Sequence, residues 1–202
     1  MDIVSEVTSA LQRHPAVKAV RLVGSRQQGT AGELSDWDFE IDTEDFEAVA
    51  RGLADLTSSL QPLAQQWDPL SRRANYMLML RGGVKVDLIF DRPYEPAPPW
   101  KVSAETIPAI DHHFWDWTLW LAAKDSAGKH ELVKESLANM SSHMLRPMGV
   151  ERIPDAIETA VELYTEARRE LDERLCVAVS DEIGRDVRRA LRNSGYRVPE
   201  AD

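Results

Sequence analysis

The segment PYEPAPPW, residues 93–100, constrains the fold most strongly, because the hydrophobic pattern of the chain changes there. Four of its eight residues are proline, which is typical of a stiff, extended linker. Before it, short apolar runs alternate with turn signals, as in strands. After it, apolar residues recur at helical spacing. We therefore predict an α+β fold, with a mixed α and β domain over residues 1–98 and a helical bundle over residues 99–202.

The first half of the chain is expected to form a mixed β-sheet flanked by helices. The predicted helices cover residues 2–13 and a segment from an N-cap at Thr43 to about Leu60. The predicted strands are 17–23, 37–42 and 63–68, followed by a hairpin of 75–80 and 84–91 around a Gly-Gly turn. Residues 37–42 alternate strictly, so that their apolar and acidic side chains point to opposite faces.

The second half is expected to form four helices. The first, over residues 103–125, is apolar on nearly all sides and should be buried. The others are predicted at 130–145, from Pro154 at the first helical position to Leu175, and at 178–194 before Gly195.

Composition excludes several classes of function. The formal net charge is −10, from 34 acidic and 24 basic residues, so a nucleic-acid partner is not expected, whereas metal ions and cationic small molecules are attracted. The single cysteine, Cys176, rules out an internal disulfide and a cysteine-based zinc site. The acidic N-terminus is unlike a signal peptide, and no apolar stretch is long enough to span a membrane. We expect a cytoplasmic protein.

Two aspartates at the start of one predicted strand carry the chemistry. Asp36 and Asp38 are two residues apart, so in a strand they share a face, with Cα atoms about 6.6 Å apart. Carboxylates this close repel each other unless a cation lies between them. Mg²⁺ prefers such oxygen ligands and commonly shares them with substrate phosphates.

A glycine and a serine end the strand before these aspartates. Gly24 allows a phosphate to approach the backbone, and Ser25 offers a hydroxyl, beside the positive charge of Arg26. Ten residues separate Ser25 from Asp36.

Asp87 is the third acidic residue of interest. It lies in the middle of the apolar run VDLIF, and a buried carboxylate there needs a partner. If its strand neighbours that of Asp36 and Asp38, three carboxylates converge on one metal site. Lys85 and Asp91 flank Asp87 on the same predicted face.

This pattern resembles the nucleotidyltransferase superfamily that includes the DNA polymerase beta-like enzymes. The matching features are the apolar strand ending in Gly24-Ser25, the Asp36-Trp37-Asp38 pair and Asp87, within residues 17–91. Within that superfamily the chain looks most like the small bacterial enzymes that adenylylate antibiotics such as aminoglycosides and lincosamides. The stretch HHFWDWTLWLAAK also resembles, more loosely, the first bundle helix of those enzymes.

The resemblance implies Mg²⁺-dependent transfer of AMP from ATP to a hydroxyl of a small acceptor, for which a cationic aminoglycoside-like molecule is one candidate. Residues 1–98 would be the nucleotidyltransferase domain, and residues 99–202 would bind the acceptor. Two Mg²⁺ ions are expected on Asp36, Asp38 and Asp87, and Asp87 is either a metal ligand, the general base or both. The remaining site residues that we expect are Gly24, Ser25, Arg26 and Lys124 for the nucleotide, and Asp116 and His112 for the acceptor.

Two alternatives remain open at the level of sequence. One is a protein- or RNA-modifying nucleotidyltransferase of the toxin–antitoxin type, although such enzymes are usually shorter and lack a full helical domain. The other is a catalytically silent nucleotide-binding module, which the complete set of acidic residues disfavours. The sequence specifies neither the acceptor nor the oligomeric state.

Overall fold

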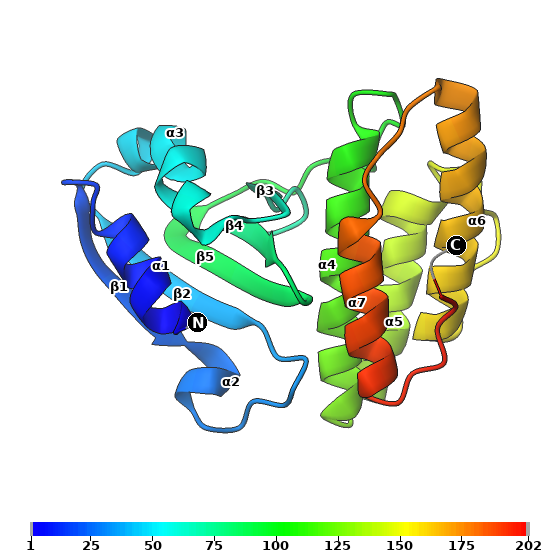
Figure 1. The fold of residues 1–202 in the computed structure, drawn as a ribbon, viewed down its shortest axis with the longest axis horizontal. Coiled ribbons are helices and arrows are strands. Elements are labelled where there is room, and N and C mark those ends of the chain that lie inside the picture. The colour runs from blue at the N-terminus through cyan, green and yellow to red at the C-terminus, as the bar shows by residue number, and fades with distance from the viewer. Residues whose placement is uncertain (1, 201–202) are drawn as a thin grey trace. The chain divides into compact units, whose positions relative to one another are not determined.

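The structure, a computed structural model, describes residues 2–200 and divides into two compact units (Figure 1). The first unit contains the residues up to Ala31 together with Ser35–Pro96, and the second contains Gly32–Leu34 and the residues from Ala97 onward. The main division therefore falls inside the proline-rich segment.

The first unit is a five-stranded mixed sheet with helices. Its elements are α1 (Ile3–Leu11), β1 (Val17–Val23), α2 (Gly24–Gln27), β2 (Trp37–Thr43), α3 (Phe46–Thr57), the 3₁₀ turn η1 (Ser58–Leu60), β3 (Ala64–Trp67), β4 (Arg73–Leu80) and β5 (Val84–Pro93). The strand order is β1-β2-β5-β4-β3. The β2–β5 pair is parallel, and the other neighbouring pairs are antiparallel. The predicted mixed sheet is confirmed.

One face of this sheet forms the core of the first unit. Phe39 of β2 and Leu88 of β5 are fully buried on that face, in one cluster with Val7 of α1 and Leu53 of α3. The two helices lie against the sheet in Figure 1. Because side chains alternate along a strand, the residues between these apolar positions point to the opposite face.

Thr43 was predicted as the N-cap of the second helix, and this prediction is wrong. Thr43 is the last residue of β2, where it pairs with Val17, and its hydroxyl donates to the carbonyl of Ala16 at 2.9 Å. The cap is Asp45, whose Oδ1 accepts from the backbone N–H of Ala48 at 3.0 Å. The strand pairing of Thr43 delays the helix start by two residues.

The second unit is helical, as predicted. It contains α4 (Ile107–Ser126), α5 (His130–Met140), the π-helical turn η2 (Ser141–Leu145), α6 (Ile157–Leu175) and α7 (Glu182–Asn193). None of the helices within residues 2–200 is long and apolar enough to cross a membrane.

Three predicted helix starts in this unit lie too early in the sequence. Pro154 precedes α6. The backbone of Ala156 is extended, so the helix begins at Ile157. Residues 103–106 form a turn in which Ser103 and Thr106 bond each other's backbone N–H groups, so α4 begins at Ile107. Similarly, α7 begins at Glu182 rather than at residue 178. In each case the apolar spacing that predicts the helix extends into the non-helical segment that precedes it.

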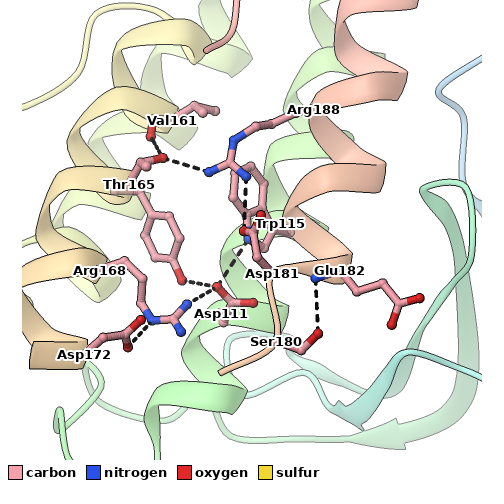
Figure 2. Close-up of polar contacts among 11 residues, drawn as sticks. Asp111, Trp115, Val161, Thr165, Arg168, Asp172, Ser180, Asp181, Glu182 and Arg188 are labelled. Carbon is pink, nitrogen blue, oxygen red and sulfur yellow. Dashed lines mark hydrogen bonds and ion pairs between the residues drawn. The ribbon is translucent and has the colours of Figure 1, made fainter. Parts of the chain in front are cut away.

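A buried carboxylate ties α4 to α6 (Figure 2). Asp111 Oδ1 accepts from Tyr164 Oη at 2.6 Å, from Arg168 Nη1 at 2.8 Å and from Trp115 Nε1 at 3.3 Å. Burial raises the pKa of Asp111, and these three partners oppose that shift. Burial also raises the pKa of Tyr164 well above its usual value, so its hydroxyl remains a donor.

Arg188 extends these contacts to α7. Its guanidinium contacts Asp181 Oδ1 at 3.2 Å and Thr165 Oγ1 at 3.0 Å, and it lies 4.6 Å from the Trp115 ring centroid. The polar contacts of Asp111 and Arg188 thus fix three helices of the unit to one another.

The Tyr164→Phe variant tests the contribution of this network. We expect a loss of about 2 kcal/mol in the free energy of unfolding, because a buried carboxylate loses a strong donor. Urea denaturation measures the loss. Tyr94→Phe, which alters a tyrosine that is 40% exposed, is the control. An equal, small effect in both variants would contradict the assignment.

Candidate functional site

Three carboxylates meet on the sheet face opposite the core. Asp38 of β2 lies directly beside Asp87 of β5 in the parallel register, and Asp36 immediately precedes β2 on the same side. One carboxylate oxygen from each of the three residues lies within 4.8 Å of the others. Asp36 and Asp87 are buried, at 8% and 4% exposure, and Asp38 is half-buried. The condition set by the sequence, that the strand of Asp87 neighbours that of Asp38, is met.

Lys85 and Asn75 hold two members of this cluster. Lys85 Nζ lies 3.0 Å from Asp87 Oδ2 and 3.6 Å from Asp36 Oδ2. Asn75 Nδ2 donates to Asp87 Oδ1 at 3.2 Å. Sequence reasoning missed Asn75, because its position depends on the register of β4 against β5. The alternation of β5 places Lys85 on this face, but sequence alone does not reveal its ion pairs.

Asp91, the other predicted neighbour of Asp87, is not part of the cluster. It lies farther along β5, is exposed, and pairs with Arg73 at 3.6 Å. Charges on this sheet face therefore fall into separate groups along the strands.

The electrostatics of Asp87 reflect its burial. Desolvation raises the pKa of its carboxyl, and the charge of Asp36 acts in the same direction, whereas Lys85 and Asn75 act against it. Buried carboxylates at this spacing are costly without positive charge among them. Lys85 supplies one positive charge for three carboxylates, so the cluster still favours a further cation.

Gly24 lies against the carboxylate of Asp38. Its φ of +70° is a conformation that other residues rarely adopt, and a Cβ at this position would overlap Asp38 Oδ2. The sequence suggests a phosphate close to Gly24; the described contact is with Asp38. Ser25 follows Gly24 directly, in the first turn of α2.

Arg26 fixes the segment that precedes β2. Its Nε donates to the carbonyl of Asp36 at 3.0 Å and to that of Ser35 at 3.1 Å, and its guanidinium lies 4.0 Å from the Trp37 ring centroid. Burial lowers the pKa of Arg26, while Asp36 and Asp38 oppose this shift. These contacts position Asp36, and the predicted contact of Arg26 with a nucleotide stays a prediction.

The predicted site residues of the second unit all lie on α4. His112 and Asp116 are four residues apart and are therefore neighbours on the helix surface, whereas Lys124 lies farther along α4. His112 and Asp116 are buried, whereas Lys124 is half-buried with its ammonium 5.2 Å from the Trp120 ring centroid. Their roles toward nucleotide and acceptor stay predictions.

The three aspartates fit Mg²⁺. This ion takes hard oxygen ligands at near-octahedral geometry and is usually held by one or two carboxylates together with water and substrate phosphates. The three carboxylates, beside the turn at Gly24, offer ligands of this kind.

The similarity of this chain to known protein structures is distant. No protein-family model and no curated protein sequence matches the chain. Among solved structures, an aminoglycoside 6-adenyltransferase from Bacillus subtilis is similar at 10% sequence identity and a TM-score of 0.40. The match covers 95% of this chain and 97% of that one. A similarity this distant does not assign an activity.

The Gly24→Ala variant tests the close approach to Asp38. Gly29→Ala is a matched control, because Gly29 has a φ of +72° but its Cβ would meet none of the described residues within 4 Å. Each variant should lose about 1 kcal/mol of stability through backbone strain. We expect Gly24→Ala to lose at least about 1 kcal/mol more, because the added methyl group overlaps the Asp38 carboxylate and displaces it. Equal losses in urea denaturation would contradict this contact.

Proposed function

We propose that this chain is a Mg²⁺-dependent nucleotidyltransferase that transfers AMP from ATP to a hydroxyl of a small acceptor. The observation that carries the proposal is the convergence of Asp36, Asp38 and Asp87 on one sheet face, beside the turn at Gly24-Ser25. Neither feature alone is specific, since paired acidic residues are common on exposed strands. Their combination with burial of two of the carboxylates favours a metal site.

Asp36, Asp38 and Asp87 are the residues that would hold Mg²⁺, and we propose that two ions bind there. When bound, Mg²⁺ would neutralise phosphate charge and align the attacking and leaving oxygens. Gly24, Ser25 and Arg26 are the proposed contacts for the triphosphate. The positive charges of Mg²⁺ and Arg26 would then offset the negative charges of the three aspartates, which would otherwise repel the phosphates.

Asp87 is also a candidate general base. In the reaction the acceptor hydroxyl oxygen bonds to the α-phosphorus, the bond to the bridging oxygen breaks, and pyrophosphate leaves. The hydroxyl proton passes to a carboxylate. The amide of Asn75 holds the Asp87 carboxylate in place, and a positioned carboxylate can take the proton of an acceptor hydroxyl within hydrogen-bond reach. Positioning and charge stabilisation would supply most of the rate enhancement.

Residues 99–202 are the proposed acceptor-binding domain, with residues 1–98 as the catalytic domain. Asp116 and His112 are proposed to contact the acceptor, and Lys124 the nucleotide. The acidic composition, with a net charge of −10, supports an acceptor with amino groups, such as an aminoglycoside. Antibiotic modification in the cytoplasm is the corresponding biological role.

Pyrophosphate release from ATP measures the proposed activity. The full chain is incubated with Mg²⁺, ATP and a panel of aminoglycosides and lincosamides. We expect release with at least one acceptor and none when EDTA removes the metal. If ATP binds but no acceptor on the panel supports turnover, the proposed substrate class is wrong.

The Asp38→Asn variant tests the proposed metal ligand. We expect kcat to fall by roughly a thousandfold, the scale of losing a main source of transition-state charge stabilisation. Asp42→Asn is the matched control, because Asp42 lies four residues along β2 on the same face and is exposed. Activity in the control should stay within about twofold of wild type, as expected for a surface change. Retained activity in Asp38→Asn would rule out its assigned role.

A further inference from the structure

Lys85 brings a positive charge into the carboxylate cluster itself. The side chain is only 8% exposed, and its ammonium contacts Asp87 at 3.0 Å and Asp36 at 3.6 Å. A buried ammonium is tolerated when it is paired and hydrogen-bonded. Two of the three proposed metal ligands thus share one lysine.

The position of Lys85 follows from β5. Lys85 lies two residues before Asp87, so both side chains are on the same face of the strand. The four-carbon stem of lysine is flexible enough to turn the ammonium along the strand toward the carboxylates. Arg26, by contrast, donates to the backbone carbonyls of Ser35 and Asp36.

The ammonium uses oxygens that a metal ion would also need. Asp36 Oδ2 and Asp87 Oδ2 belong to the carboxylates that could hold the ion. A monovalent and a divalent cation at contact distance from the same oxygens repel each other strongly in a buried site. Either the ammonium moves when the ion binds, or it lowers the affinity for the ion by staying.

We propose that Lys85 is an internal counter-cation that holds Asp36 and Asp87 together in the metal-free protein and competes with the divalent ion for them. This inference rests on the proposed function, because it takes the three aspartates as the metal site. Lys85 stabilises the metal-free fold and lowers the affinity of the site for Mg²⁺. Lys85 is thus a positioning residue that sets the metal concentration at which the site fills.

The Lys85→Met variant tests this competition without an activity measurement. Calorimetric titration with Mn²⁺ gives the affinity, and thermal unfolding in EDTA and in Mg²⁺ gives the stability of each state. We expect Mn²⁺ to bind about tenfold more tightly than to wild type, because a nearby positive charge is removed. We also expect a lower Tm in EDTA and a larger rise in Tm on adding Mg²⁺ than in wild type. Unchanged or weaker Mn²⁺ binding by the folded variant would overturn the proposal.

Two further variants keep the test decisive. Lys85→Gln removes the charge but keeps an amide donor for Asp87, so it should change Mn²⁺ affinity in the same direction if Lys85→Met does not fold. Lys18→Met removes an exposed lysine whose ammonium pairs with the exposed carboxylate of Glu44 at 2.8 Å. This control should leave Mn²⁺ affinity unchanged.

The possible failures are distinguishable. If wild type binds Mn²⁺, Asp38→Asn abolishes binding, and Lys85→Met does not bind more tightly, the competition is wrong while the metal site stands. If Lys85→Met binds Mn²⁺ more tightly than wild type and Lys18→Met binds it equally, but ATP is not turned over, the proposed function is wrong while the role of Lys85 stands. If neither wild type nor Lys85→Met binds Mn²⁺, both proposals are overturned.

Discussion

The parallel pairing of β2 with β5 is the constraint on which the candidate site depends. It is the parallel pair in a sheet whose other neighbouring strands are antiparallel, and its register places Asp38 beside Asp87. Phe39 and Leu88, the next residues on each strand, are fully buried on the opposite face. A slip of one residue would move an apolar side chain out of the core and a carboxylate into it. Core packing therefore holds the two carboxylates together.

This arrangement places like charges next to one another, and the surrounding residues compensate for that cost. Lys85 supplies positive charge, and Asn75 donates to the oxygen of Asp87 that Lys85 does not contact. Gly24 leaves room for the carboxylate of Asp38. Buried like charges destabilise the folded state, and such clusters are typical of sites that bind a ligand of opposite charge. The three carboxylates therefore favour a cation as the ligand.

Much of the fold follows from local patterns in the sequence. Alternation in residues 37–42 and 84–91 predicts both the strands and the face on which Asp38 and Asp87 lie. The pairing of those strands is not local, since a helix and two other strands separate them in sequence, so sequence alone gives their convergence only as a condition. Asn75 and the contacts of Lys85 depend on strand register and side-chain conformation. Helix starts such as that of α6 were missed because apolar spacing does not report where helical backbone geometry begins.

A crystal structure with Mg²⁺ and a nonhydrolysable ATP analogue tests whether the three aspartates form the metal site. We expect metal density coordinated by Asp36 and Asp38, with the triphosphate beside Gly24-Ser25. We also expect that the Lys85 ammonium no longer contacts Asp36. Bound nucleotide at another position, with the three aspartates free of metal and the ion pairs of Lys85 unchanged, would contradict this assignment.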